Sequence, residues 1–227
     1  MKNTDNKIKN ISLPKVILFD WDGTLVNTNG IYRGVLRQTL EEMGISEWDT
    51  EAEEKYRFYS RREALPLIFG NKWQKINDNY MKNINKLDVK LINPFPNVLH
   101  LLKYLAEKNV IMSIISNKDS HLLKEEVNYL GWTSYFHKII GSSDAPRDKP
   151  WPDPVYLALE DNKIDDFNDV WFVGDSIVDM QCARETGCFP ILFGTETNAA
   201  AQMHYLKMNY IHISDHEELV IKHKELK

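Results

Sequence analysis

Residues 16–25 read Val-Ile-Leu-Phe-Asp-Trp-Asp-Gly-Thr-Leu, and the rest of the chain can be interpreted outward from this stretch. Its first four residues are apolar on both faces, which is typical of a strand in a parallel sheet that helices cover on both sides. Because residues two apart in an extended chain project to the same side, Asp20 and Asp22 begin close together. Two neighbouring anions are costly unless a cation or a proton compensates them. The stretch therefore predicts a charged site at the end of a buried strand.

The same order of apolar run, polar turn and helical segment recurs along the chain. Strands that alternate with helices predict an α/β fold, here a Rossmann-like three-layer sandwich with a mostly parallel sheet. Gly131 and Gly187 follow two of the helical segments, where a glycine is expected to end a helix. The further strand-like runs are Val110 to Ile115, Ile139-Ile140, Val170 to Val173, Pro190 to Phe193 and Tyr210 to Ile213.

One region, residues 29–93, has no strand-like run and shows only helical patterning. Pro94 and Pro96 then interrupt the chain, because neither proline fits inside a helix or a central strand. The helices expected in this insert run from Ile31 to Met43, from Ala52 to Phe69 and from Trp73 to Lys86. The division that follows is a flexible N-terminal tail at 1–14, an α/β catalytic core at 15–28 and 94–227, and an inserted all-helical cap at 29–93.

The composition excludes several classes of protein. Hydrophobic residues make up 43 % of the 227 residues and charged residues 27 %, which is the balance of a folded domain. No apolar run approaches the roughly 20 residues of a membrane helix, and residues 1–10 lack the apolar centre of a secretory signal. The net charge of −5 argues against a nucleic-acid backbone as the main partner. We expect a cytoplasmic protein that binds neither nucleic acid nor membrane; its oligomeric state has no signature in the sequence.

Small polar and charged residues follow the other strand-like runs. Ligands of open parallel sheets bind beyond the carboxyl ends of the strands, so these residues are candidates for one shared site. Acidic oxygen ligands without Cys or His partners favour Mg²⁺ over zinc, and a lysine can stabilise both a carboxylate and a phosphoryl group. The candidates are Ser116 and Asn117 after the second run, Lys149 after the third, and Asp175 and Asp179 after the fourth.

Each of these pieces alone also has a purely structural interpretation. An Asp-x-Asp-Gly segment is often only a turn, and a single lysine such as Lys149 is most often solvated. Asp175 and Asp179 could cap a helix that begins near Ser176. The joint pattern favours a site, because all the pieces occur in order and each follows a strand-like run.

Four short motifs are thus present in order: Phe19 to Leu25, Ser116-Asn117, Lys149-Pro150, and Gly174-Asp175 through Asp179. In these motifs the chain resembles the haloacid dehalogenase superfamily of hydrolases, in the phosphatase branch whose helical cap is inserted after the first strand. The resemblance covers nearly the whole chain after about Lys15. It is closest in general to phosphoglycolate phosphatase-like and β-phosphoglucomutase-like members.

The resemblance implies a role for each motif residue. Asp20 is expected to attack phosphorus and form an aspartyl-phosphate. Asp22 is expected to protonate the leaving alcohol and then to activate water, while Lys149 neutralises charge on Asp20 and on the phosphate. The remaining implied roles are phosphate binding by Ser116, Asn117 and Gly23, Mg²⁺ binding by Asp20, by the backbone carbonyl of Asp22 and by Asp175, and support of the metal by Asp179.

The function that the resemblance implies is Mg²⁺-dependent hydrolysis of a small phosphorylated metabolite, with phosphoglycolate as the expected substrate. The presence of Asp22 favours phosphoryl chemistry, since the dehalogenase members of the family lack this second aspartate. Two alternatives stay open: a phosphomutase of the β-phosphoglucomutase type, and a non-catalytic binding module on the same fold.

The cap offers one candidate for substrate recognition. Ser60-Arg61-Arg62-Glu63 loosely resembles the segment in which a β-phosphoglucomutase-like protein places a substrate-binding arginine. An arginine fork binds a phosphate or a carboxylate bidentately, so Arg61 and Arg62 are expected substrate contacts, with a solvated helix face as the alternative. A set of aromatic side chains is interpreted as packing within the cap and its hinge: Trp48, Tyr56, Phe58, Tyr59, Phe69 and Trp73.

Overall fold

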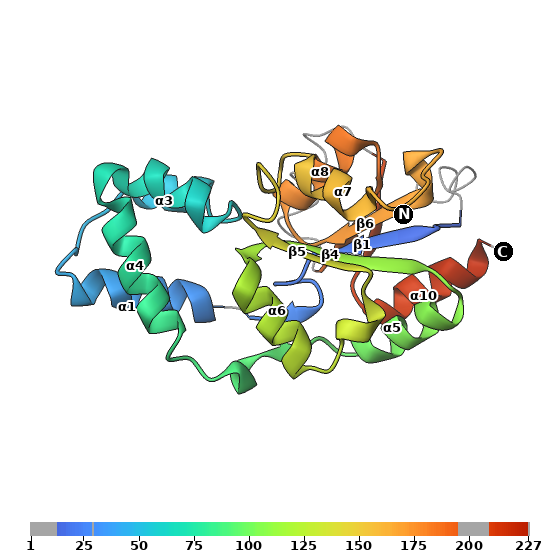
Figure 1. The fold of residues 1–227 in the computed structure, drawn as a ribbon, viewed down its shortest axis with the longest axis horizontal. Helices are drawn as coiled ribbons and strands as arrows, with labels where there is room; N and C mark the ends of the chain where they lie inside the picture. The colour runs from blue at the N-terminus through green and yellow to red at the C-terminus, as the bar shows by residue number, and fades with distance from the viewer. Residues whose placement is uncertain (1–12, 29, 195–208, 227) are drawn as a thin grey trace, which may run out of the picture.

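The computed structural model describes residues 13–28, 30–194 and 209–226, and within them the main sheet has six strands (Figure 1). The strand order is β5-β4-β1-β6-β7-β8, and every neighbouring pair is parallel. Each strand overlaps one of the predicted apolar runs, so the predicted parallel sheet is confirmed. The strands are β1 Val16–Phe19, β4 Ile111–Asp119, β5 Lys138–Ser142, β6 Val170–Gly174, β7 Phe189–Phe193 and β8 Ile211–Ile213.

Strand β1 lies at the centre of the sheet, between β4 and β6. Its last residue, Phe19, is in register with Ile114 of β4 and Val173 of β6. Because the three strands are parallel, the polar residues that follow them meet at one edge of the sheet. The edge beyond Phe19 is therefore where the sequence motifs converge.

Helices cover both faces of the sheet, as its two-sided apolar strands require. Alternate strand residues divide between two buried clusters: Ile17 and Phe19 join one, and Val16 and Leu18 join the other. The first face packs against α5 Val98–Glu107, α6 Ser120–Tyr129 and α10 His216–Glu225, and the second against α7 Asp153–Leu159 and α8 Ile177–Thr186. This arrangement is the expected three-layer α/β sandwich.

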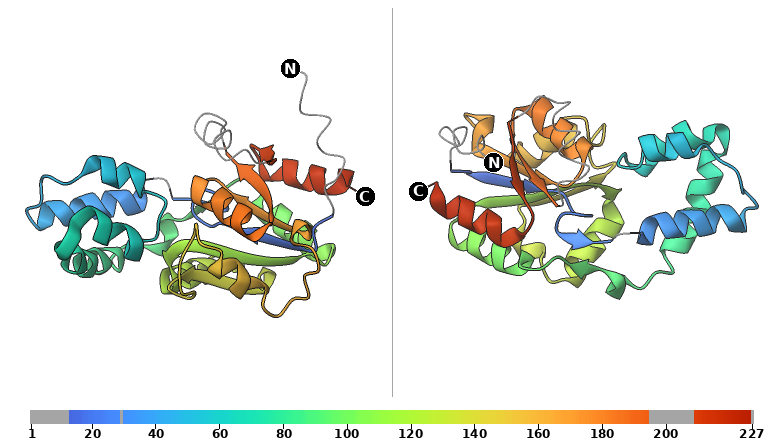
Figure 2. Two further views of the ribbon diagram at one scale, coloured as in Figure 1. Left: turned by 90° about the horizontal axis from the view of Figure 1, so that it is seen from above. Right: turned by 180° about the vertical axis from the view of Figure 1, so that it is seen from behind.

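A group of helices inserted after β1 lies beside the core in all three views (Figures 1 and 2). Val35, Tyr80 and Ile84 form a small buried cluster within it. The two crossings between insert and core pair as an antiparallel ribbon, in which β2 Val26–Asn27 lies against β3 Asn93–Pro94. The helices are α1 Ile31–Glu42, α2 Thr50–Lys55, α3 Arg61–Phe69 and α4 Trp73–Ile84.

Two predicted elements differ from the structure. The helix expected from Ala52 to Phe69 is two helices, because Ser60 is extended (φ −64°, ψ 154°) and the residues before it form a turn. Strand β4 continues four residues beyond the predicted run, so Ser116 and Asn117 belong to the strand instead of the loop after it. The register between β4 and β5 shifts between Ile115 and Asp119, where this extension begins.

Two of the predicted segments, the N-terminal tail and the cap, include residues that the structure does not describe. Residues 1–12 of the predicted N-terminal tail and residue 29 at the start of the predicted cap lie outside the described residues. None of the helices in the described part of the chain is both long and apolar enough to span a membrane.

Candidate active site

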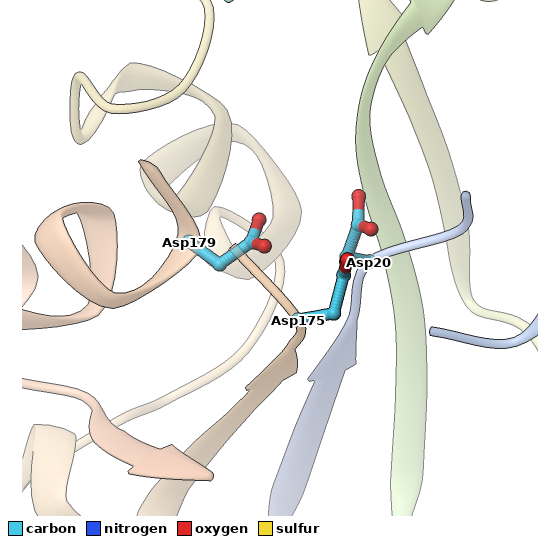
Figure 3. A group of neighbouring side chains, drawn as sticks. All are labelled: Asp20, Asp175 and Asp179. Carbon is cyan, nitrogen blue, oxygen red and sulfur yellow. The ribbon is translucent and has the colours of Figure 1, made fainter. Parts of the chain in front are cut away.

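Three carboxylates meet beyond the carboxyl ends of β1 and β6. Asp20 directly follows β1, Asp175 directly follows β6, and Asp179 lies in the first turn of α8. One oxygen of each carboxylate lies within 4.8 Å of the others, and Figure 3 shows the three groups facing one another. Asp20 and Asp179 are buried, with 6 % and 0 % of their surface exposed.

Lys149 inserts into this cluster from the segment after β5. Its ammonium donates to Asp20 Oδ1 at 2.5 Å and to Asp179 Oδ1 at 2.6 Å, and the side chain is almost fully buried. Asp179 also accepts from the hydroxyl (2.5 Å) and amide (3.0 Å) of Ser176, which caps α8. Asp179 therefore caps α8 with one oxygen, as one interpretation predicted, and contacts Lys149 with the other.

The cluster has three carboxylates and one ammonium, so additional positive charge would stabilise it. Burial raises the pKa of Asp20 to about 7, although the neighbouring Lys149 ammonium opposes that shift. Burial and the nearby Asp20 carboxylate raise the pKa of Asp175 well above its ordinary value. Three carboxylates share one ammonium, and their oxygens are hard ligands of the kind that Mg²⁺ prefers. The donor set thus fits a divalent cation.

Two glycines allow the carboxylates to approach this closely. Gly23 has φ +85°, and a Cβ at this position would lie 2.5 Å from Asp175 Oδ2. A Cβ on Gly174 would lie 2.5 Å from Cβ of Asp179. Side chains at either position would displace the cluster. The Gly23 amide donates to the Val26 carbonyl at 2.9 Å, so what Gly23 contributes is space.

Ser116 and Asn117 differ in how their side chains are used. The Ser116 oxygen accepts from the Lys118 amide at 3.2 Å, which leaves its hydroxyl proton free for another acceptor. The Asn117 amide group instead donates to the carbonyls of Phe58 and Lys149, both at 2.9 Å, and its oxygen accepts from the Lys149 amide at 3.0 Å. Asn117 therefore ties together the segment that carries Lys149 and the turn between α2 and α3.

Asp22 has partners that the sequence analysis missed. Its Oδ1 accepts from Thr28 Oγ1 and from Lys118 Nζ, both at 2.7 Å. Lys118 also donates to both carboxylate oxygens of Glu126, at 2.7 and 2.6 Å, and its ammonium lies 4.2 Å from the centre of the Tyr32 ring.

Glu126 is the buried centre of this second network. It accepts from Trp21 Nε1 at 2.6 Å and from the hydroxyl of Tyr32 on α1. The network thus links the insert to Asp22 through α6. An acidic residue on the buried face of α6 was the only signal in the sequence, and nothing there identified its partners.

The two arginines expected to contact substrate lie in different places. Arg61 lines the cavity described below, donates to Asn77 Oδ1 at 2.6 Å and lies 3.5 Å from the Asp119 carboxylate. Arg62 forms a two-pronged ion pair with the buried Asp148, at 2.7 and 2.8 Å, and also donates to the Ala145 carbonyl at 3.1 Å. Arg62 therefore joins the insert to the segment that carries Lys149.

A cavity of about 410 Å³ lies between core and insert, and most of the predicted core site residues form its floor, although Asp179 does not line it. Its walls come from α1, α3, α4 and the turn between α2 and α3. The cavity floor thus holds a buried carboxylate bound to an ammonium together with a second carboxylate, that of Asp22. The core residues that line the floor include Asp20, Asp22, Gly23, Ser116, Asn117, Lys118, Lys149 and Asp175.

Comparisons with known proteins agree with this architecture. Residues 17–193 match the family described as haloacid dehalogenase-like hydrolase. The chain is 29 % identical over 196 residues to a phosphoglycolate phosphatase of Aquifex aeolicus, which covers 86 % of this chain and 88 % of that protein. A haloacid dehalogenase superfamily hydrolase from Ehrlichia chaffeensis superposes with a TM-score of 0.65 at 29 % identity, over 95 % of this chain and 98 % of that one. A β-phosphoglucomutase from Clostridium difficile shares the fold, with a TM-score of 0.71 at 19 % identity, over 93 % and 98 % of the two chains.

Proposed function

The chain belongs to the haloacid dehalogenase-like hydrolase family, and from this premise we propose that it is a Mg²⁺-dependent phosphatase of a small phosphorylated metabolite. One observation carries the proposal. The Asp20 carboxylate lies on the floor of a cavity, bound to the Lys149 ammonium at 2.5 Å, with the Asp22 carboxylate lining the same cavity. These are the groups that a two-step phosphoryl transfer requires.

In the first step, an oxygen of Asp20 forms a bond to phosphorus while the bond from phosphorus to the ester oxygen breaks. Asp22 gives a proton to that leaving oxygen, and the alcohol departs. In the second step, Asp22 takes a proton from water, whose oxygen attacks phosphorus. The bond to Asp20 then breaks, which releases inorganic phosphate and restores the carboxylate.

Other residues of this chain stabilise the charge on the transferred group. Lys149 neutralises part of the charge on Asp20, and the free hydroxyl proton of Ser116 is available to a phosphoryl oxygen. Asn117 acts indirectly, because its amide holds the backbone on both sides of the cavity.

The carboxylates of Asp20 and Asp175 and the backbone carbonyl of Asp22 would hold Mg²⁺, with Asp179 supporting the site through Lys149 and Ser176. When bound, Mg²⁺ supplies positive charge that draws electron density from the phosphoryl oxygens. Thr24 adds to this arrangement by donating to Asp175 Oδ1 at 3.2 Å. It was not identified from the sequence.

We assign Lys118 and Glu126 as positioning residues for Asp22. Lys118 Nζ and Thr28 Oγ1 hold the same oxygen of Asp22, and Glu126 fixes Lys118 through both of its own oxygens. The hydroxyl of Tyr32 on α1 reaches the same glutamate. Asp22 is thereby oriented by groups from both the core and the insert.

The proposal also divides the chain into a cap and a core that move relative to each other. We take residues 29–93 as the cap and residues 15–28 and 94–227 as the core, with the ribbon of β2 and β3 as the crossing point. Closure of the cap would exclude water other than the reacting molecule.

Phosphoglycolate is the first substrate to test, because the Aquifex relative bears that name. A phosphomutase, in which Asp20 returns the phosphoryl group to a sugar, is the alternative, and the likeness to β-phosphoglucomutase extends only to the fold. A non-catalytic module is disfavoured because every motif residue is present. The proposal is for an enzyme that acts in the cytoplasm without a nucleic-acid or membrane partner.

The test is release of inorganic phosphate from a panel of phosphomonoesters, with Mg²⁺, with EDTA, and with Mg²⁺ added back. We expect release that requires Mg²⁺ and is absent in Asp20→Asn. Equal release with EDTA would contradict the metal assignment, and equal release by Asp20→Asn would contradict the nucleophile. Consumption of a sugar bisphosphate without net phosphate release would favour the mutase.

A further inference from the structure

The insert side of the cavity is a wall of aromatic and aliphatic side chains. Tyr56, Phe58 and Tyr59 come from the turn between α2 and α3, and the rings of Tyr56 and Tyr59 meet edge to face at 5.5 Å. These three residues were expected to pack within the cap and its hinge; each is partly exposed and lines the cavity. The other apolar and aromatic residues of this wall are Tyr32, Leu36, Ala64, Leu65, Ile68 and Tyr80.

The cations on this side already have partners. Arg33 donates to Glu53 at 2.8 Å, and Arg57 donates to Glu54 at 2.6 Å while its guanidinium lies 4.4 Å from the centre of the Phe58 ring. Arg61 is held by Asn77 and Asp119, as described above. Among the described residues that line the insert side, every arginine thus has an acidic or amide partner. The charge of each guanidinium is thus already balanced by a neighbouring carboxylate (Glu53, Glu54 and Asp119, respectively), which weakens its attraction for a second anionic group of a substrate.

The aromatic turn is hydrogen-bonded to the core beside the reacting groups. The Asn117 amide donates to the Phe58 carbonyl and to the Lys149 carbonyl, both at 2.9 Å. One side chain from β4 therefore sets the position of the aromatic turn and of the segment that carries Lys149. A ligand whose phosphate lies near Lys149 would have the rest of its structure facing this turn.

We propose that the alcohol part of the substrate is uncharged and carries a planar ring that packs against Tyr56, Phe58 and Tyr59. This inference rests on the proposed phosphatase function and narrows its substrate class. Aromatic faces bind planar rings through stacking and dispersion without a charge requirement. The cavity volume, about 410 Å³, falls within the range of pockets that enclose ring-containing ligands. A two-carbon acid such as phosphoglycolate would leave most of the wall uncovered.

The test compares pairs of esters in which one member carries a planar ring and the other does not. Adenosine 5′-monophosphate is compared with ribose 5-phosphate, and benzyl phosphate with ethyl phosphate, with phosphoglycolate as the charged two-carbon reference. We expect kcat/KM to be at least about fivefold higher for the ring-bearing member of at least one pair. We also expect that ester to exceed phosphoglycolate.

Variants separate ring contact from general damage. Tyr59→Leu is expected to bring the ratio of kcat/KM between the two members of the preferred pair close to one, and Tyr59→Phe is expected to keep that ratio. Tyr56→Leu serves as a second variant, and Tyr129→Leu, at an exposed position on α6, is the control. Circular dichroism checks that each variant is folded.

The outcomes distinguish failure of the proposed substrate class from failure of the proposed phosphatase function. Phosphate release without a ring preference in either pair, a preference for phosphoglycolate, or a ratio unchanged in both Tyr59→Leu and Tyr56→Leu would overturn the substrate class and leave the phosphatase intact. No release from any ester would overturn the phosphatase, and this inference with it.

Discussion

The floor and the insert-side wall of the cavity are built from side chains in different surroundings. On the floor, the side chains of Lys149 and its partners Asp20 and Asp179 are 2 %, 8 % and 1 % exposed. On the wall, the ion pair of Arg57 with Glu54 joins side chains that are 42 % and 57 % exposed. Buried charges interact strongly and cannot turn to water, whereas exposed ones exchange with solvent.

Because of this difference, we expect the floor and the wall to have different roles in the site. The floor is set by strand ends and close-packed glycines, so its geometry is fixed before a ligand arrives. The wall includes partly exposed side chains, such as Tyr56, Phe58 and Tyr59, on helices and a turn of the insert, and substitutions there need not disturb the sheet. Changes on the floor should therefore abolish turnover or stability, while changes on the wall should alter preference among substrates. The following predictions are ordered from the largest expected effect to the smallest.

The largest effect is expected for Asp20→Asn on the floor. An amide cannot serve as the attacking carboxylate, so kcat/KM should fall by at least about 10³-fold. Steady-state phosphate release measures this, and Asp78→Asn on the exposed face of α4 is the matched control. A loss below about tenfold would assign the attack to another group.

Lys149→Met tests the buried cluster itself. Removal of the ammonium leaves Asp20 and Asp179 facing each other without their shared cation, so the free energy of unfolding should drop by about 3–5 kcal/mol. Urea denaturation without added divalent metal measures the change. A drop below about 1 kcal/mol would show that the cluster behaves like an exposed ion pair.

His216, a buried histidine of α10, extends the comparison to a titratable group outside the carboxylate cluster. Burial lowers its pKa from 6.5 to about 4, so the folded protein binds this proton less readily than the unfolded chain does. The contribution of neutral His216 to the free energy of unfolding is therefore complete above pH about 6.5. It is lost as the pH falls towards 4, by up to about 3 kcal/mol. Urea denaturation between pH 7 and 4 should show a shallower decline for His216→Phe. The exposed His121→Gln should keep the decline of the original protein.

Lys118→Met tests the group that orients Asp22. Because Lys118 holds Asp22 without belonging to the proposed chemistry, kcat should fall by about 10- to 100-fold while KM changes by less than about twofold. Lys118→Arg should recover part of kcat. Lys124→Met, which removes an exposed lysine of α6, should leave both constants unchanged. A rise in KM with constant kcat would make Lys118 a substrate contact instead.

The smallest effect is expected for Arg57→Ala on the wall. Its pair with Glu54 is exposed, so the free energy of unfolding should change by less than about 1 kcal/mol. Urea denaturation beside Lys149→Met gives the direct comparison of an exposed and a buried ion pair. A loss as large as that of Lys149→Met would remove the distinction between floor and wall.

The sequence by itself determined the sheet and most of the residues of the floor, Lys118 excepted. Runs such as Val16–Phe19 are apolar on both faces, and this local pattern is enough to identify buried parallel strands. The site residues Asp20, Lys149 and Asp175 follow such runs, and the parallel topology brings the ends of the strands together. The local apolar pattern, together with the rule that parallel strands end at one shared edge of the sheet, was therefore enough to predict where these residues lie.

Only the tertiary structure determined which side chains contact one another and which side chains line the walls of the cavity. The contact of Lys118 with Glu126, the pairing of Arg62 with Asp148 and the exposure of Tyr59 to the cavity depend on how helices and turns pack. The break at Ser60 within the predicted helix has the same origin. A side chain on a helix or turn meets partners set by packing between distant segments, and no periodicity in the sequence records them. Strand ends in a parallel sheet, in contrast, share one edge whatever packs around them.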